Sequence, residues 1–265
     1  MTLAEAFSIG GRESISIVGA GGKTTLLFAL GRELSALRCG VILTTTTKIF
    51  EPAPLPSFLQ FLSPDLNAVK KWVVEHAAHN RSLLLARERL PGGKLAGLPP
   101  LWVDELFGLD GISTIVVEAD GAAGRPLKAP RAGEPVIPDS TTILVPVIGI
   151  DGLDRPLDEE TVFRSEIASR LLDLPLGSAV TKEAVGRLML EWIKPAPAGA
   201  RIVPLINKAD LPGGREKAEI LARHLLSLHL PGIRQVLLGQ LRPVPALMAR
   251  ISTWRWNGAK GKTKR

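Results

Sequence analysis

The chain has 265 residues, of which 45% are hydrophobic and 22% charged, and these proportions are typical of a globular protein. Its single cysteine, Cys39, excludes an intramolecular disulfide, which favours a reducing compartment. The longest apolar run, residues 143–150, is far shorter than the roughly 18 residues that a membrane-spanning helix needs. The first residues show no secretory signal pattern, so we expect a cytoplasmic protein.

The formal net charge of +7 would favour a nucleic-acid partner if it were spread over a folded surface. Much of it instead belongs to the end of the chain, which contains Lys260, Lys262, Lys264 and Arg265. We therefore predict a basic flexible tail over residues 258–265 and do not expect a nucleic-acid partner. Residues 1–257 are expected to form a single α/β domain, with a smaller helical insertion around residues 151–200.

The first informative stretch follows a short apolar strand that we predict over residues 15–18. It reads Gly19-Ala20-Gly21-Gly22-Lys23-Thr24-Thr25 and leads into a helix predicted over residues 24–37. A strand, a glycine turn and a helix N-terminus form the layout of a phosphate-binding loop, because the glycines let backbone N–H groups point at an anion. All of these residues are predicted to bind nucleotide phosphates.

Lys23 is expected to reach the β- and γ-phosphates as a catalytic point charge, and the Thr24 hydroxyl to contact Mg²⁺. The pattern departs from the full G-x-x-x-x-G-K-[ST], because Ile17 stands where the first glycine belongs. The shorter spacing resembles the ATP loop of the Mur-type amide ligases. The alternative is a glycine-rich turn with an exposed lysine and no ligand.

The next predicted strand, residues 41–45, runs into four threonines, Thr44 to Thr47. Threonine favours strands by itself, but ligands bind at the carboxyl ends of strands in open α/β sheets. These hydroxyls, Thr45 among them, are therefore candidates for binding a phosphate or Mg²⁺. Further on we predict a helix over 65–79, a strand over 82–86, a loop over 91–97 in which Lys94 could face an anion, and a helix over 100–107.

A buried-type strand over residues 114–118 ends in two acids, Glu118 and Asp120. A hydrophobic strand that ends in carboxylates is what a nucleotide enzyme uses to hold Mg²⁺ or to orient water. Both residues are thus catalytic and metal-binding candidates, although an Asp-Gly pair is also a common turn.

The loop after these acids carries a cation at every third residue, Arg125, Lys128 and Arg131. Prolines stiffen the loop, so it could present these cations to a phosphate or a carboxylate substrate. The alternative is a solvated loop without a ligand.

A second motif follows a predicted strand at 142–148, helical pieces within 158–195 and a strand at 201–206. Asn207-Lys208-Ala209-Asp210 resembles the guanine-reading motif of GTPases. The Asp210 carboxylate could accept from two N–H groups of guanine that adenine lacks. Asn207 would brace the neighbouring loop, and the stem of Lys208 would cover one face of the base.

The chain continues with a predicted helix over 215–229, a strand over 235–238 and a last helix over 244–251. Strands and helices alternate along most of the sequence, which is typical of a parallel sheet. We therefore predict a P-loop NTPase-like α/β fold, with a mostly parallel sheet and helices on both faces. The loop, the threonines, the acids and Asn207–Asp210 should meet at one edge of this sheet.

With these residues in hand, the chain resembles the selenium-dependent hydroxylase accessory proteins, often called YqeC. The resemblance covers about residues 15–240 and rests on residues 18–25, 44–47, 118–121, 126–130, 134–138 and 207–210. One departure is Phe163, where we expect a histidine before Arg164. The resemblance implies a nucleotide-binding protein that helps mature molybdenum hydroxylases.

Three functions remain open at this stage. The first is a Mg²⁺-dependent NTPase, using GTP or ATP, that assists a molybdenum hydroxylase or its maturation machinery. The second is an ATP-dependent ligase or kinase whose small anionic substrate is held by Arg125, Lys128 and Arg131. The third is a nucleotide-gated scaffold or chaperone without an enzymatic step.

Overall fold

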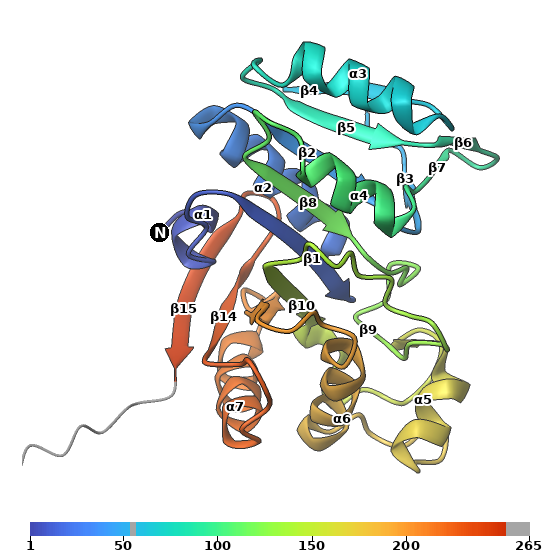
Figure 1. Cartoon of the computed structure of the whole chain (residues 1–265). Helices are drawn as coiled ribbons and strands as arrows, with labels where there is room; N and C mark the ends of the chain where they lie inside the picture. The colour runs from blue at the N-terminus through green and yellow to red at the C-terminus, as the bar shows by residue number, and fades with distance from the viewer. Residues whose placement is uncertain (54–56, 253–265) are drawn as a thin grey trace, which may run out of the picture.

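The computed structural model describes residues 1–53 and 57–252 (Figure 1). Its central sheet has the order β15-β14-β13-β10-β1-β8-β2-β5-β4, and β12 also pairs with β10. The strands are β1 (Glu13–Gly19), β2 (Val41–Thr45), β4 (Phe58–Leu62), β5 (Ser82–Ala86), β8 (Thr114–Glu118), β10 (Ile143–Gly149), β12 (Arg201–Ile202), β13 (Leu205–Asn207), β14 (Gln235–Gln240) and β15 (Ala246–Ser252). All neighbours are parallel except β14 and β15.

Helices cover both faces of this sheet, because most of its central strands are apolar on both sides. One face packs against α1 (Leu3–Ala6) and α2 (Lys23–Leu37). The other packs against two groups of helices: α3 (Leu66–His76) with α4 (Pro100–Phe107), and α5 (Ser165–Leu172) and α6 (Lys182–Ile193) with α7 (Gly214–Ser227). The expected mostly parallel α/β fold is confirmed, and it is consistent with a P-loop NTPase-like architecture.

The connection from β8 to β10, residues 119–142, contains no helix and covers part of the face between the two helix groups. It lies against the polar side of β1, where Ser14 and Ser16 are buried. The Ser16 hydroxyl lies 2.8 Å from that of Thr141, and the Ser14 hydroxyl 3.3 Å from that of Ser140. These contacts give the buried serines hydrogen-bonding partners and hold the connection beside the centre of the sheet.

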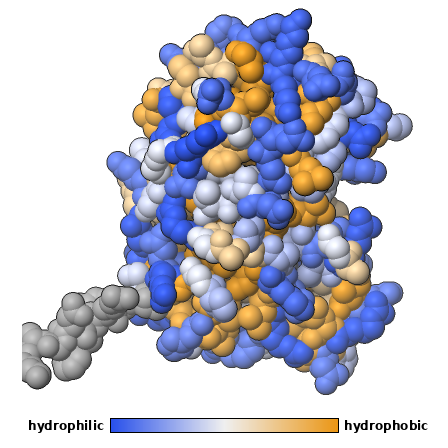
Figure 2. Space-filling view, in the orientation of Figure 1, coloured by the Kyte–Doolittle hydropathy of each residue, from blue (hydrophilic) through white to orange (hydrophobic). Residues whose placement is uncertain are grey.

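Two small sheets lie beyond the carboxyl ends of the central strands. One contains β3 (Lys48–Phe50), β7 (Lys94–Ala96) and β6 (Glu88–Leu90), and the other pairs β9 (Leu127–Lys128) with β11 (Val162–Phe163). A 3₁₀ turn, η1 (Ile150–Gly152), follows β10. Figure 2 shows a mainly hydrophilic surface whose outline narrows between the half with α3 and α4 and the half with α5 to α7. Within the described residues, no helix is long and apolar enough to cross a membrane.

The sequence prediction of a helix over residues 244–251 is wrong, because β15 occupies residues 246–252. Exposed and partly buried residues alternate along β15, as expected for a strand with one packed face. Two further differences are smaller. The loop predicted over 91–97 contains β7, and Pro204 lies between β12 and β13, which the sequence predicts as one strand.

Other predicted elements agree with the structure. The broken helical region predicted within 158–195 is α5 and α6, and the Thr181 hydroxyl accepts from the Ala184 N–H at the start of α6. Trp192 of α6 is fully buried in the same core cluster as Val18 of β1. The predicted basic tail, residues 258–265, lies outside the described residues.

Candidate nucleotide-binding site

The glycine loop connects β1 to α2, and its shape depends on three glycines. Gly19, Gly21 and Gly22 have φ values of +85°, +81° and +142°. Residues with a Cβ atom rarely adopt such positive φ values. Space is also limiting: a Cβ atom on Gly21 would lie 2.3 Å from the backbone nitrogen of Gly149 on β10. The loop can therefore approach its neighbours this closely only with glycine at these positions.

The first backbone N–H groups of the loop already have partners within the protein. The N–H of Gly19 donates to Asp120 Oδ2 (3.1 Å), that of Ala20 to the Val147 carbonyl (2.9 Å), and that of Gly21 to the Arg125 carbonyl (3.0 Å). These bonds fix the loop to β10 and to the connection between β8 and β10.

The N–H groups that remain for an anion are those of residues 22–25 at the start of α2. The first N–H groups of a helix have no intrahelical partner, and Gly22 at the N-cap offers no side chain to accept from them. The positive end of the helix dipole lies at the same place. The loop thus exposes a short set of donors next to Lys23, Thr24 and Thr25.

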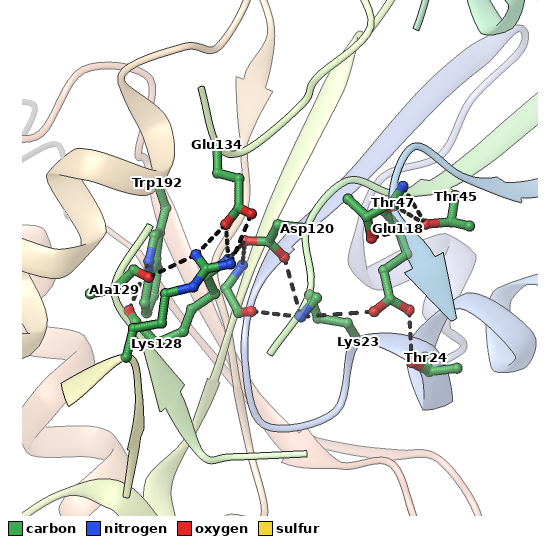
Figure 3. A network of polar contacts seen from close by, with 12 residues as sticks. Lys23, Thr24, Thr45, Thr47, Glu118, Asp120, Lys128, Ala129, Glu134 and Trp192 are labelled. Atoms are coloured by element: carbon green, nitrogen blue, oxygen red, sulfur yellow. Dashed lines mark hydrogen bonds and ion pairs between the residues drawn. The ribbon is translucent and has the colours of Figure 1, made fainter. Parts of the chain in front are cut away.

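The Lys23 side chain is only 3% exposed and points into a group of oxygen atoms (Figure 3). Its ammonium donates to the Gly19 carbonyl at 2.7 Å, and it lies 3.2 Å from Asp120 Oδ1 and 3.8 Å from Glu118 Oε1. Asp120 Oδ1 receives no hydrogen bond from the described residues, so Lys23 provides its charge compensation. The predicted lysine and the two predicted acids therefore form one cluster.

Thr24 and Glu118 form the outer part of this cluster. The Thr24 hydroxyl donates to Glu118 Oε2 at 2.7 Å. Burial raises the pKa of the Glu118 carboxyl, while Lys23 and Thr24 oppose that rise. A hydroxyl and a carboxylate beside free backbone donors fit Mg²⁺, which prefers oxygen ligands and is commonly bound together with the phosphates of a nucleotide. Thr24 and Glu118 would hold the ion.

The cluster continues away from the loop as a chain of alternating charges (Figure 3). Lys128 lies 3.0 Å from both Asp120 Oδ2 and Glu134 Oε2. Glu134 in turn accepts two bonds from the Arg164 guanidinium, at 2.6 and 2.9 Å, and lies 2.9 Å from Arg131. The buried charges thus link the glycine loop to the start of α5.

This arrangement corrects the prediction for Lys128. The sequence placed it beside Arg125 and Arg131 in a loop that presents cations to a substrate, but its side chain is fully buried between two carboxylates. An anion in the cavity could reach it only if those ion pairs broke. Arg125 and Arg131 line the cavity. Their contact with a phosphate or carboxylate substrate remains a prediction.

Thr45 also differs from its predicted placement. Its hydroxyl is buried and donates to the Glu118 carbonyl at 2.7 Å, and it accepts from the Thr47 N–H at 3.0 Å. It joins the ends of β2 and β8 and does not line the cavity, whereas Thr46 and Thr47 do. The neighbouring hydroxyls are therefore the better placed of the threonine run for contact with a ligand.

The Asn207–Asp210 motif begins at the end of β13, on the side of the glycine loop opposite to Glu118. The Asn207 side-chain N–H donates to the Gly21 carbonyl at 2.7 Å, which is the bracing contact that the sequence predicted. The Lys208 ammonium lies 2.5 Å from Asp151 Oδ2. Asp210 is exposed and lines the cavity. Base recognition by these residues remains a prediction.

A single cavity of about 1180 Å³ joins most of these residues. It contacts the start of α2, Glu118, the 121–125 turn, Arg131, Glu134, Arg164, Asn207, Lys208, Asp210 and Leu211. Gly19, Ala20, Asp120, Lys128 and Thr45 lie behind its wall, where they shape and support the lining. The expected meeting of distant motifs at one sheet edge therefore holds for the loop, Glu118 and the Asn207–Asp210 motif.

Sequence reasoning missed the roles of Glu134, Arg164 and Asp151. Glu134 stands out in the sequence only as part of the family pattern at 134–138, and no pattern gives Arg164 a role. Arg164 lies at φ +65° directly before α5, which turns its side chain back onto Glu134. No spacing rule in the sequence predicts that contact, because the two residues belong to separate loops.

Glu134 makes the stability of this cluster dependent on pH. Burial would raise its pKa, but the bonds from Arg164 and Lys128 outweigh burial and lower the pKa from 4.5 to about 2. A carboxyl with a lowered pKa stabilises the fold above its unfolded pKa, and this contribution is lost as the pH falls from about 4.5 to 2. The difference corresponds to about 3 kcal/mol. Glu118, whose pKa is raised, has the opposite dependence.

We therefore expect the free energy of unfolding, measured with urea, to fall as the pH is lowered from 5 to 3. The Glu134→Gln variant should be less stable at pH 6, because Lys128 and Arg164 lose their shared carboxylate, but its stability should change less over the acid range. Equal pH dependence in the two proteins would contradict the role of Glu134.

Alanine substitution at two glycines, Gly21 and Gly124, separates the cost of backbone strain from the cost of a steric clash. Gly124 has φ +77° and no atom within 4 Å of the place a Cβ would occupy, so Gly124→Ala should cost about 1–2 kcal/mol, from the left-handed backbone alone. Gly21 has a similar φ of +81° but a blocked Cβ position, so Gly21→Ala should be clearly more destabilising. Thermal unfolding of both variants tests this, and equal losses would contradict the steric argument.

The fold and the site together define an α/β protein with a glycine loop at a helix N-terminus and carboxylates on the adjacent strand. The YqeC protein family model matches residues 15–166, which is more than half of the chain. An Escherichia coli (strain K12) protein described as "Uncharacterized protein YqeC" is 30% identical over 242 residues, which cover 89% of this chain and 91% of that protein. The chain belongs to the YqeC family.

Proposed function

We propose that this protein binds a nucleoside triphosphate with Mg²⁺ at residues 19–25 and hydrolyses it, as an accessory factor in the maturation of selenium-dependent molybdenum hydroxylases. The observation that carries the nucleotide part is Lys23, buried beside two carboxylates at a helix N-terminus whose N–H groups face a large cavity. The accessory role is proposed from the family resemblance.

The residues suggest a division of tasks. The N–H groups of residues 22–25 and the Lys23 ammonium would bind the phosphates, and Mg²⁺ would neutralise part of their charge. Lys23 would exchange its contact with the Gly19 carbonyl for a phosphate oxygen. Asp120 and Glu118 would keep Lys23 in place, and Glu118, at the cavity wall, would orient the attacking water.

A triphosphate site makes a simple prediction about ligand length. Titration of the intact chain with Mg²⁺ and GTP, ATP, GMP or AMP should give saturable binding that weakens strongly when the β- and γ-phosphates are absent. Equal binding of the mono- and triphosphates would contradict a phosphate loop, because the base would then supply the affinity. Release of phosphate over time tests hydrolysis, and binding without turnover would favour the nucleotide-gated scaffold.

Asp210 supports a preference for GTP over ATP. It is exposed at the cavity wall, and its motif is attached to the loop through Asn207 and Gly21. Asp210→Ala should weaken GTP binding at least tenfold and leave ATP binding within twofold, since a pair of hydrogen bonds to guanine is lost. The control Asp173→Ala removes an acid that does not line the cavity and should leave both affinities unchanged. Tight ATP binding with a silent Asp210→Ala would support the ligase or kinase alternative.

The second candidate, an ATP-dependent ligase or kinase, is favoured by the size and charge of the cavity. Arg125 and Arg131 line the same cavity as the loop, so a small anion could lie beside the nucleotide. The first candidate nevertheless ranks higher, because Arg131 is already paired with Glu134.

A further inference from the structure

The cavity carries more positive charge than the glycine loop needs. Its lining contains nine lysine and arginine side chains and three acids, Glu118, Glu134 and Asp210. Four of the cations, Lys23, Arg131, Arg164 and Lys208, form ion pairs with carboxylates. Within the described chain, the other five have no carboxylate within 4.0 Å: Lys48, Arg87, Lys94, Arg125 and Arg242.

Three of these unpaired cations belong to or adjoin the small sheet of β3, β7 and β6. Phe50 pairs with Lys94 and Lys48 with Ala96, so Lys48, Phe50 and Lys94 share one face of it. The other face carries Ile49 and Leu95, which are buried in the core. Arg87 is held beside this sheet by its N–H, which donates to the Ala96 carbonyl at 2.9 Å. Glu88 also belongs to the cation-bearing face but does not line the cavity.

The small sheet is fixed to the end of β2. The Gly97 N–H donates to the Thr47 carbonyl at 2.7 Å, and the Leu98 N–H to the Thr45 carbonyl at 2.8 Å. A Cβ atom on Gly97 would lie 2.3 Å from the Thr45 carbonyl oxygen, so only glycine permits this approach. Thr45 is in turn bonded to the Glu118 carbonyl. The backbone that carries the cations is therefore fixed relative to Glu118.

The order of the strands separates these cations from the base-binding motif. β1 and its loop lie at the centre, β13 with Asn207 lies two strands away on one side, and β2 lies two strands away on the other. A nucleotide whose base contacts Asp210 and whose phosphates lie at the loop extends toward β13. The small sheet lies on the β2 side of β1, away from β13 (Figure 1). It would then face the γ-phosphate end, on the side that the base leaves free.

We propose that Lys48, Arg87 and Lys94 form a binding site for a second small molecule, a phosphate ester with a flat or apolar group, next to the γ-phosphate. This inference rests on the proposed nucleotide site. Three uncompensated cations call for an anion of more than one charge, as a phosphate provides. Phe50 is 65% exposed on the same face, with the Lys94 ammonium 5.0 Å from its ring centre, and offers a surface for the apolar group.

The cavity has room for both ligands. Its volume of about 1180 Å³ exceeds the range of roughly 300–1,000 Å³ that is usual for a pocket holding one drug-sized ligand. The cations of the small sheet are exposed, so a ligand can replace their water without breaking an ion pair.

The test uses the intact chain saturated with Mg²⁺ and a non-hydrolysable triphosphate, into which pyrophosphate is titrated by calorimetry. Pyrophosphate should bind, and Lys48→Ala/Lys94→Ala should weaken it at least tenfold while triphosphate affinity stays within twofold. The control Arg32→Ala/Lys71→Ala removes two exposed cations that do not line the cavity and should change neither affinity. Unchanged pyrophosphate binding in the first variant would overturn the site, and a parallel loss of triphosphate affinity would assign the cations to the nucleotide instead.

A second comparison identifies the ligand class. Phenyl phosphate should bind the saturated chain more tightly than inorganic phosphate, and Phe50→Ala should remove the difference; equal affinities in the wild type would overturn the ester assignment.

Pyrophosphate binding to the nucleotide-free Lys23→Ala chain keeps the two proposals apart. Binding that persists there, and is lost when Lys48→Ala/Lys94→Ala is added, supports the second site even if the nucleotide site fails.

Discussion

Replacement of Lys128 by methionine should destabilise the protein by about 3–5 kcal/mol, because it leaves the buried carboxylates of Asp120 and Glu134 without their shared cation. Methionine fills a similar volume, so the loss reports charge compensation more than packing. A typical domain has a total stability of about 5–15 kcal/mol, and the variant would therefore lose a large part of it. Urea unfolding of the wild type and Lys128→Met measures the effect.

Arg131 provides the matched control for this prediction. It contacts the same Glu134 carboxylate at 2.9 Å, but its side chain is 68% exposed. An exposed ion pair contributes about 0–1 kcal/mol, so Arg131→Ala should leave stability nearly unchanged. Similar losses in the two variants would mean that burial does not decide the strength of this network.

Replacement of Lys23 by alanine should lower the affinity for a nucleoside triphosphate at least a hundredfold. Lys23 is the loop cation next to the free N–H groups of α2, and the nearby Lys128 cannot take its place there, because it is held between Asp120 and Glu134. The change also leaves Asp120 Oδ1 without its cation, so some loss of stability should accompany the loss of binding. Circular dichroism must show that the variant is folded at the temperature of the binding experiment.

Much of the central sheet could be predicted from the sequence, because its strands are continuous apolar runs between turn residues. Strands 41–45, 82–86 and 114–118 have the predicted bounds. The end of the sheet at β15 shows where this reasoning fails. Val244, Leu247, Met248 and Ile251 have the spacing of a helix face, yet residues 246–252 pair with β14 and alternate as a strand. Pairing with a neighbouring strand outweighed the local pattern.

The candidate site was predictable where a motif ends a strand and unpredictable where it depends on the path of a loop. The loop, Glu118 and Asn207 meet because parallel strands place their carboxyl ends at one edge. The contact of Lys128 with Asp120 and Glu134 depends on how residues 119–142 fold over β1. The small sheet of β3, β7 and β6 escaped prediction because strands of three residues carry too little pattern.

The most direct test of the central claim is a calorimetric titration of Mg²⁺-bound GTP and ATP into the wild-type chain and into folded Lys23→Ala. We predict saturable binding of at least one triphosphate to the wild type at one site per chain, and no measurable binding to the variant under the same conditions. Absence of binding to the wild type, or equal affinity in the two proteins, would contradict the assignment of residues 19–25 as a nucleotide-binding loop.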